Sequence, residues 1–257
     1  MSVHQGFEGQ TVMISGGLGD IAQATALAFG KAGARIALSD ITPLDEAESR
    51  IAELRKQHVE VHYTVVDVRD PEAVAMWLIE VTSLWGKVSI AIANAATVTM
   101  KRFQELTPAA WIREMEVNLN GSFFLANAAC RHFVETGIHG NVVFLGSWAA
   151  HAVHEALPAY GVSKAAIRML CQSMALEYAP HGIRLNEVAP GYVNAGLSRS
   201  VWNEDPSQAE AARLRVPVQA LIEPAEVARQ VLWLCDPQNK HFTGSTLLMD
   251  GGLSLKR

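Results

Sequence analysis

The sequence predicts an α/β fold in which a doubly wound sheet of seven parallel strands has helices on both faces. Short apolar runs rich in β-branched residues alternate with amphipathic stretches, and several of these stretches have proline in their first turn. No linker or low-complexity tract interrupts the 257 residues, of which 49% are hydrophobic. A chain of this length can bury one substantial core. We therefore expect a single domain over residues 1–257.

The individual strands and helices are predicted from the pattern of apolar residues along the chain. Near-continuous apolar runs indicate strands, because the strands of a parallel sheet are covered on both faces. Seven such runs span residues 11–15, 35–39, 61–66, 88–93, 141–146, 184–188 and 245–249. Helical periodicity is found at residues 21–32, 43–57, 71–84, 108–135, 158–179 and 224–235. Right-handed crossovers then distribute the helices over both faces of the sheet.

Residues 193–222 depart from the alternation. This stretch contains Pro206 and Pro217, several charges and a few large apolar residues such as Trp202. We expect it to be a substrate-binding flap, because long connections in compact domains are often functional lids. The alternative is a surface excursion that packs only against a neighbouring subunit.

Bulk properties narrow the classes of ligand and compartment. A net charge of −5 with scattered Lys and Arg gives no basic field for nucleic acid, so small molecules are the expected ligands. The three cysteines, Cys130, Cys171 and Cys235, lie far apart in apolar helical patterns, which favours reduced, packed thiols. No leader-like segment and no apolar run long enough to span a bilayer is present. A cytoplasmic protein without membrane contact is expected.

The first strand leads into a glycine-rich turn that indicates a dinucleotide site. Gly16, Gly17 and Gly19 permit a tight turn and the close approach of a pyrophosphate, and the amides near Asp20 and Ile21 at the helix start favour its charge. The position of the turn between a strand and a helix is the context that this motif requires.

Asp40, at the end of the second strand, indicates which dinucleotide is bound. Its carboxylate would accept hydrogen bonds from both adenosine ribose hydroxyls and repel a 2′-phosphate, so NAD is favoured over NADP. The alternative is that Asp40 caps the next helix. Asp67 and Asn94 end the third and fourth strands at the same edge, where a role in lining the cofactor site is expected.

Ser147, Tyr160 and Lys164 form the candidate catalytic set. Positions 160 and 164 share a helix face, so the ammonium group can lower the pKa of the phenol by favouring phenolate. A tyrosine tuned in this way accepts a proton near neutral pH. Ser147 follows a strand and would bring a second hydroxyl to the same sheet edge. The tyrosine and lysine alone more often represent a packed aromatic with a solvated neighbour, so the prediction depends on the whole ordered set.

These motifs resemble the classical short-chain dehydrogenase/reductase family, and the resemblance extends from the first strand to Asp250, Gly251 and Gly252. It implies a seven-stranded Rossmann fold and a homotetramer built on the two long helices. It also implies that the catalytic residues are Asn118, Ser147, Tyr160 and Lys164, with Asn118 anchoring a water. The implied cofactor-binding residues are Gly16, Gly19, Asp20, Ile21, Asp40, Asp67, Val68, Asn94, Ala95, Tyr160, Lys164, Pro190, Gly191 and Val193.

Several positions differ from the family pattern. Ser15 stands where threonine is usual, Asp20 and Ala22 stand where glycines are usual, and Ala96 replaces another glycine. Ala195 replaces a threonine, and losing that hydroxyl would weaken NAD binding by about 1 kcal/mol if it removes one hydrogen bond. Turns that read Gly-Asp-Ile are compatible with the family, so retained cofactor binding is expected.

The implied reaction is the NAD-dependent interconversion of a secondary alcohol and a ketone. Aromatic and hydrogen-bonding residues after the catalytic serine and after the Pro-Gly loop favour a sugar, polyol or similar hydroxylated molecule. The candidate substrate-binding residues are Trp148, His154, Tyr192 and Trp202. His151 and His154 lack a nearby third ligand, so no metal is expected. The alternatives are a 3-oxoacyl-thioester reductase, which Asp40 disfavours, and a non-catalytic dinucleotide-sensing protein.

Overall fold

The computed structural model describes residues 6–196, 199 and 206–256. Seven parallel strands form one sheet in the order β3-β2-β1-β4-β5-β6-β7, which confirms the predicted fold class. The order reverses between β1 and β4, the switch point at which ligands bind in open parallel sheets. The strands are β1 (Thr11–Ser15), β2 (Arg35–Asp40), β3 (Val61–Val65), β4 (Ile90–Ala93), β5 (Asn141–Leu145), β6 (Arg184–Pro190) and β7 (Thr246–Met249).

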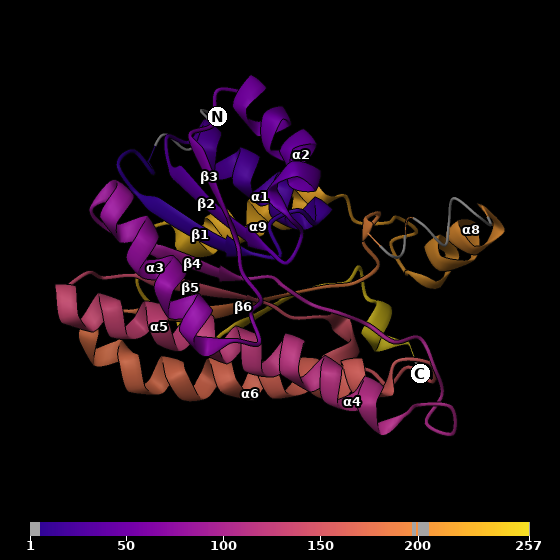
Figure 1. The fold of residues 1–257 in the computed structure, drawn as a ribbon. Helices are drawn as coiled ribbons and strands as arrows, with labels where there is room; N and C mark the ends of the chain where they lie inside the picture. Colours follow the sequence, from indigo (N-terminus) through magenta and orange to yellow (C-terminus); the bar gives the residue numbers. More distant parts are fainter. Residues whose placement is uncertain (1–5, 197–198, 200–205, 257) are drawn as a thin grey trace.

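Helices cover both faces of this sheet (Figure 1). One face carries α1 (Asp20–Lys31), α2 (Leu44–Lys56) and α9 (Pro224–Cys235). The opposite face carries α3 (Pro71–Trp85), α5 (Gly121–Thr136) and α6 (Pro158–Tyr178). The other helical elements with described bounds are α4 (Pro108–Glu114), η1 (Met115–Asn120), η2 (Trp148–Ala150), η3 (Ala179–His181), α8 (Pro206–Arg215) and η4 (Leu253–Leu255). Each face buries its own apolar cluster against the sheet.

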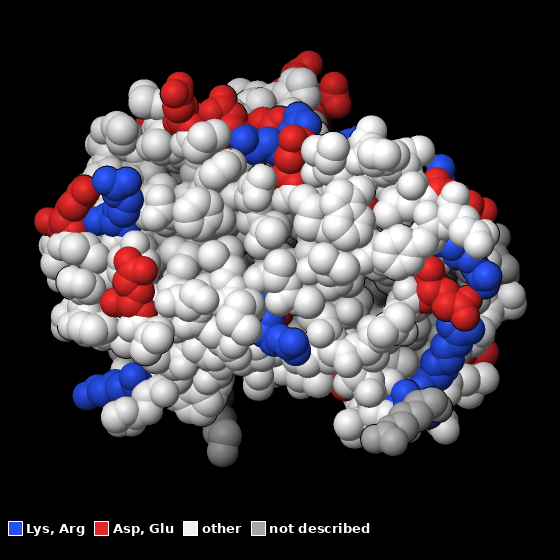
Figure 2. Space-filling model, turned by 90° about the horizontal axis from the view of Figure 1, so that it is seen from below, with Lys and Arg blue, Asp and Glu red and all other residues white. Residues whose placement is uncertain are grey.

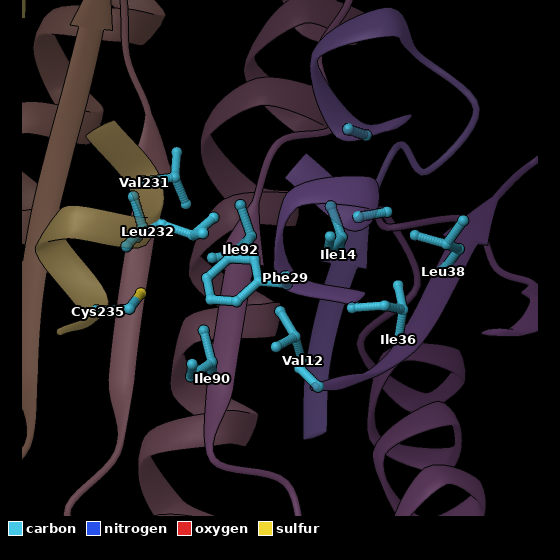
Figure 3. Close-up of a cluster of buried hydrophobic side chains, with 14 of the residues drawn as sticks. Val12, Ile14, Phe29, Ile36, Leu38, Ile90, Ile92, Val231, Leu232 and Cys235 are labelled. Atoms are coloured by element: carbon cyan, nitrogen blue, oxygen red, sulfur yellow. The ribbon is translucent and has the colours of Figure 1, made fainter. Parts of the chain in front are cut away.

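The first cluster supports the glycine turn. Phe29 of α1 lies among Val12, Ile14, Ile90 and Ile92 of the central strands (Figure 3). All five side chains are at most 1% exposed. Because α1 begins directly after the turn, the packing of its inner face determines where the helix N-terminus points.

Removal of the Phe29 ring is expected to destabilise the protein strongly. Phe29→Ala should lower the free energy of unfolding by about 3–5 kcal/mol, because it leaves a cavity in a close-packed core. Phe103→Ala is the matched control, since the Phe103 side chain is 68% exposed. Urea denaturation followed by circular dichroism measures both variants. Equal losses in the two variants would contradict the packing described here.

The expected helix over residues 108–135 is divided into three parts. A π-helical turn, η1, lies between α4 and α5, so the chain is helical from Pro108 to Thr136, as predicted, with a π-turn that the sequence pattern did not indicate. Gly121 opens α5 and packs against Val68, whose Cγ2 would lie 2.6 Å from a Cβ at that position. Asn118 lies within the π-turn, where its side chain is fully buried. Single π-turns often occur at functional sites.

The segment 193–222 begins and ends at one point of the fold. The Asn194 N–H donates to the Ile222 carbonyl (2.8 Å) and the Ile222 N–H donates to the Tyr192 carbonyl (2.9 Å), forming a parallel bridge at Val193 and Ile222. The segment contains α8, which stands out from the sheet in Figure 1. The bridge therefore holds the two ends of this segment together just after the end of β6. Among the described helices, none is long and apolar enough to cross a membrane.

Candidate active site

A cleft of about 610 Å³ runs along the carboxyl ends of the central strands. It brings together residues that the sequence distributes over the first 196 positions, and α8 contributes to its wall. Of the predicted cofactor-binding residues, the cleft is lined by Gly16, Gly19, Asp20, Ile21, Asp40, Asn94, Ala95, Tyr160, Lys164, Pro190 and Val193. The predicted catalytic residues Ser147, Tyr160 and Lys164 line it together.

The glycine turn is held against the end of β4. Gly16 has φ +63°, and a Cβ there would lie 2.8 Å from Ala95 Cα, so no larger residue fits. The Ser15 hydroxyl accepts the N–H groups of Asn94 (3.1 Å) and Ala95 (3.2 Å). The Asn94 amide donates to the backbone carbonyls of Ser15 (3.0 Å) and Gly16 (3.1 Å). These contacts leave the amides at the start of α1 facing the cleft, which suits a pyrophosphate.

Asp40 stands beside this turn at the end of β2. Its carboxylate accepts the N–H of Leu18 (3.3 Å) and the N–H of Ile41 (2.8 Å). The N-cap of α2 is Pro43, and that helix has no side-chain cap bond. Asp40 is therefore not the cap of α2, and its carboxylate is held at the mouth of the glycine turn.

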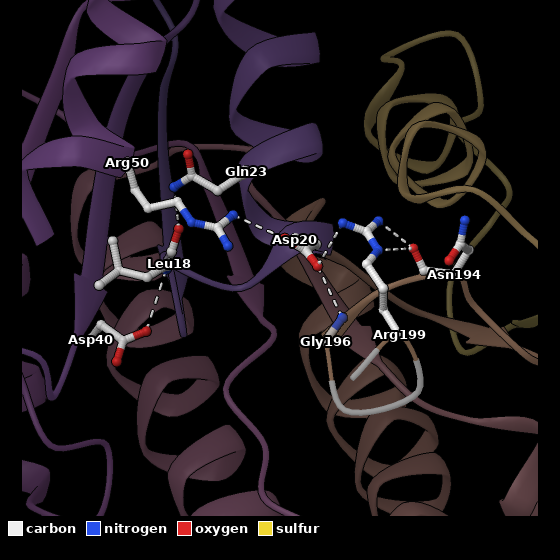
Figure 4. Close-up of polar contacts among 9 residues, drawn as sticks. Leu18, Asp20, Gln23, Asp40, Arg50, Asn194, Gly196 and Arg199 are labelled. Carbon is white, nitrogen blue, oxygen red and sulfur yellow. Dashed lines mark hydrogen bonds and ion pairs between the residues drawn. The ribbon is translucent and has the colours of Figure 1, made fainter. Parts of the chain in front are cut away.

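Asp20 links the glycine turn to the segment that follows β6 (Figure 4). One carboxylate oxygen accepts from Arg50 (2.9 Å), and the other accepts the Gly196 N–H (2.9 Å) and lies 3.5 Å from Arg199. Burial raises the pKa of Asp20, but these three partners together lower it below its usual value. The acidic residue in the glycine turn is thus accompanied by two arginines, which offset its charge.

The catalytic candidates meet at the end of β5. Ser147 follows β5 and caps η2, with its hydroxyl accepting the Ala149 N–H (3.2 Å). Tyr160 and Lys164 come from the first turns of α6 and share one face of that helix. The Lys164 ammonium donates to the Leu145 carbonyl (2.7 Å) and lies 5.4 Å from the centre of the Tyr160 ring. Serine, tyrosine and lysine therefore form one cluster.

Burial dominates the electrostatics of this cluster. Burial raises the pKa of Tyr160 to about 12; its hydrogen bond with Ser147 lowers this pKa and the nearby Glu114 raises it. Burial also lowers the pKa of Lys164 to about 8, although Glu187 raises it. The expected lowering of the tyrosine pKa by the lysine is not seen, because desolvation of the phenolate is the larger effect.

Asn118 lies beneath the cleft and does not line it. Its side-chain amide donates to the Thr97 carbonyl (2.9 Å) and to the Ser163 hydroxyl (3.0 Å), and its side-chain oxygen accepts the Thr97 N–H (2.8 Å). The Asn118 backbone carbonyl accepts from Ser122 (2.6 Å). Asn118 therefore joins the loop after β4 to α6 through its side chain.

Three predicted cofactor residues lie outside the cleft lining. Asp67 is paired with Arg69 (2.9 Å from Nε to Oδ2), which is the main cause of its lowered pKa. Val68 is buried under Gly121. Gly191 packs against Asp250, whose Cα would lie 2.8 Å from a Cβ at that position. Asp67 faces a smaller depression that it shares with Asp70 and Glu116.

The predicted substrate residues gather on one wall. Trp148 makes edge-to-face contacts with Tyr192 (5.3 Å) and His154 (5.9 Å), and all three line the cleft. Trp202 lies outside the described residues. Sequence reasoning missed the loop after β4, including Thr97 and Met100, and the α8 residues that complete the cleft. No periodic or motif signal marks them, because they reach the site only through the chain path.

The order of the sheet, the glycine turn at its switch point and the serine, tyrosine and lysine in one cleft define a nucleotide-linked oxidoreductase fold. A family model described as enoyl-(acyl carrier protein) reductase matches residues 16–254. The chain belongs to the short-chain dehydrogenase/reductase family, as its motifs predicted. It is an oxidoreductase of the class that acts on CH–OH groups.

Several known proteins are similar over nearly their full length. L-rhamnose 1-dehydrogenase (NAD(P)(+)) of Sphingomonas sp. (strain SKA58) is 28% identical, over 96% of this chain and 96% of that protein. Glucose 1-dehydrogenase 2 of Bacillus subtilis (strain 168) is 29% identical, over 98% of each chain. The crystal structure of NAD+-bound xylitol dehydrogenase is 29% identical with a TM-score of 0.89, covering 96% of this chain and 99% of that one.

Proposed function

We propose that this protein is an NAD-dependent dehydrogenase that interconverts a secondary alcohol and a ketone on a sugar, polyol or similar hydroxylated molecule. The observation that carries the proposal is the shared cleft, which joins Asp40 at one end to Ser147, Tyr160 and Lys164 at the other. The names of the rhamnose, glucose and xylitol relatives support the substrate class. Conversion of NAD to NADH by a panel of sugars and polyols, measured at 340 nm, tests it.

In the oxidation direction Tyr160 would take the proton of the substrate hydroxyl, and Ser147 would orient that oxygen. The dinucleotide, when bound, supplies hydride acceptance. Lys164 would hold the nicotinamide ribose and place a positive charge beside the phenolate as it forms. Asn118 would anchor a water for proton exchange. Since its side chain holds Thr97 and Ser163, this would fall to its backbone carbonyl.

The cofactor assignment rests on the adenosine end of the cleft. Gly16 lets the turn pack directly against Ala95 at the end of β4, and the carboxylate of Asp40 presents acceptors beside Leu18. These features fit a ribose with two free hydroxyls, and the negative charge of Asp40 opposes a 2′-phosphate. Asp67, Val68 and Gly191 remain proposed cofactor contacts, although they lie outside the cleft lining.

The pKa of Lys164 predicts how ketone reduction depends on pH. Below about pH 8 the lysine is protonated, and the raised pKa of Tyr160 keeps the phenol ready to donate. We expect kcat/KM for ketone reduction to be level at lower pH and to fall above about pH 8. Lys164→Arg should shift this fall to higher pH, because arginine stays charged. An unshifted fall in the variant would assign the titration to another group.

Two other functions need to be tested against this one. The description of the family model, an enoyl-(acyl carrier protein) reductase, makes reductases of acyl thioesters the second candidate. Tighter binding of NADPH than of NADH, followed by tryptophan fluorescence, would favour it. A dinucleotide-sensing protein without activity would bind NADH and oxidise no alcohol.

Assembly and location complete the proposal. The outer faces of α5 and α6 expose Phe123, Val134, Val162, Met169 and Leu176, and this side of the molecule is largely uncharged in Figure 2. Exposed apolar surface of this kind marks a protein interface. We infer a homotetramer that buries this face, and a cytoplasmic location in which the three buried, unpaired thiols stay reduced. Residues 1–257 are proposed to form one domain with a flap at 193–222.

The assembly is expected to depend on this face. Leu176 is 82% exposed in the single chain, so Leu176→Lys should shift the mass measured by light scattering from tetramer to a smaller species. Val153→Lys is the control, because Val153 is 99% exposed but belongs to neither α5 nor α6. A monomeric unmodified protein would contradict the inferred tetramer.

A further inference from the structure

One wall of the cleft, formed by the end of α8 and the segment after Ser147, has a chemistry that the proposed function leaves unused. Arg215 is the last residue of α8 and lines the cleft. The next residue, Val216, is only 3% exposed and packs in a small cluster with Trp148 and Leu253. Trp148 directly follows the catalytic serine. The backbone of Arg215 is therefore attached close to the reacting end of the cleft.

Arg215 has no acidic partner within the described part of the chain. The nearby acids are already engaged: Glu210 binds Arg213 (2.6 Å) and Glu155 binds Arg102 (2.6 Å). The other formally charged residues of the cleft lining are Asp20 and Asp40 at the glycine turn and Lys164 beneath the tyrosine. The substrate end of the cleft thus has a cation that no described residue neutralises.

His154 adds a second donor to the same wall. Its Nδ1 accepts the Ala156 N–H (3.2 Å), so the neutral ring carries its proton on Nε2. Burial lowers the pKa of His154, and the positive charge of Arg215 lowers it further, while Glu155 raises it. The imidazole is therefore neutral and donates. Two hydrogen-bond donors on one wall of the cleft, Arg215 and His154, favour a substrate group that can only accept hydrogen bonds, such as a carboxylate.

Resting on the proposed dehydrogenase function, we propose that the substrate carries a carboxylate that binds Arg215 and His154, so that the natural substrate is a sugar acid or related hydroxy acid. A guanidinium group binds a carboxylate through two parallel hydrogen bonds. Trp148 and Tyr192 then cover the carbon chain, and Ser147 and Tyr160 meet the hydroxyl that is oxidised. A neutral polyol would leave the arginine without a partner.

Matched substrate pairs test this with the purified protein and NAD. Gluconate is compared with glucitol, and a sugar phosphate is included as a second anion. Unmodified protein should oxidise the acid with the highest kcat/KM. Arg215→Met should lower kcat/KM for the acid by roughly 10- to 100-fold, mainly through KM, and change the polyol little. Arg215→Lys should recover part of the loss, and Arg213→Met on the same helix should have no such effect.

The outcomes separate the inference from the proposed function. Equal or better use of the neutral polyol, or an Arg215→Met variant that loses both substrates equally, would overturn the carboxylate assignment while leaving the dehydrogenase in place. Preference for the sugar phosphate would also overturn it. If no substrate of either kind is converted in either direction, the proposed function fails. In that case, the Kd of gluconate for the NADH complex, measured by tryptophan fluorescence, still tests the role of Arg215. An unchanged Kd in the Arg215→Met variant would overturn that role.

Discussion

Replacement of Tyr160 by phenylalanine is expected to lower turnover by about 10²–10⁴-fold, the contribution of a positioned general acid or base. Only the hydroxyl group is removed, and the ring that packs beside Lys164 remains. Binding of NADH should persist, because the glycine turn and Asp40 lie on other elements. Steady-state kinetics and NADH titration by fluorescence measure the two effects separately.

Tyr178→Phe is the matched control for this substitution, since Tyr178 ends the same helix far from the cleft lining. It should keep normal turnover. Full activity in the Tyr160→Phe variant would remove tyrosine from the mechanism, and loss of NADH binding in that variant would show a structural effect instead of a chemical one.

Asp40→Ser is expected to produce the second large effect, a change in cofactor preference. Loss of the carboxylate removes hydrogen bonds to a charged acceptor, which should lower kcat/KM with NAD by roughly 10- to 100-fold. It also removes the repulsion of a 2′-phosphate, so kcat/KM with NADP should rise. The ratio of the two values in each variant is the measured quantity.

Asp45→Ser controls for a general change of charge near α2, because Asp45 is an exposed residue in the first turn of that helix. Its cofactor ratio should match that of the unmodified protein. If the unmodified protein already prefers NADPH, Asp40 does not select the cofactor, and the thioester reductase becomes the better hypothesis.

The predicted strands and helices are all present because a covered parallel sheet imposes a strong local pattern. Apolar runs such as residues 11–15 can satisfy their burial only in the interior, and proline and glycine mark where the chain leaves it. The predicted helical stretch over 108–135 is confirmed, but its pattern did not indicate the π-turn of η1 within it. Periodicity alone does not register such a turn.

The pKa values and ion pairs of the site could not be predicted from the spacing of residues along the sequence. The i, i+4 relation between Tyr160 and Lys164 correctly placed both groups on one face. The pKa of the tyrosine nevertheless rises, because burial depends on the elements that close over the site and not on the helix that carries it. The same holds for the pairing of Asp20 with Arg199, which joins positions far apart in the chain.

The sequence by itself determined the fold class, the glycine turn, the acidic end of β2 and the serine, tyrosine and lysine set, because each is written in short-range spacing or in the order of elements. Only the tertiary structure decided that Asn118 lies beneath the cleft and that Arg215 reaches the wall beside Trp148. Those placements depend on packing between distant segments, and burial and charge act through space regardless of separation along the chain.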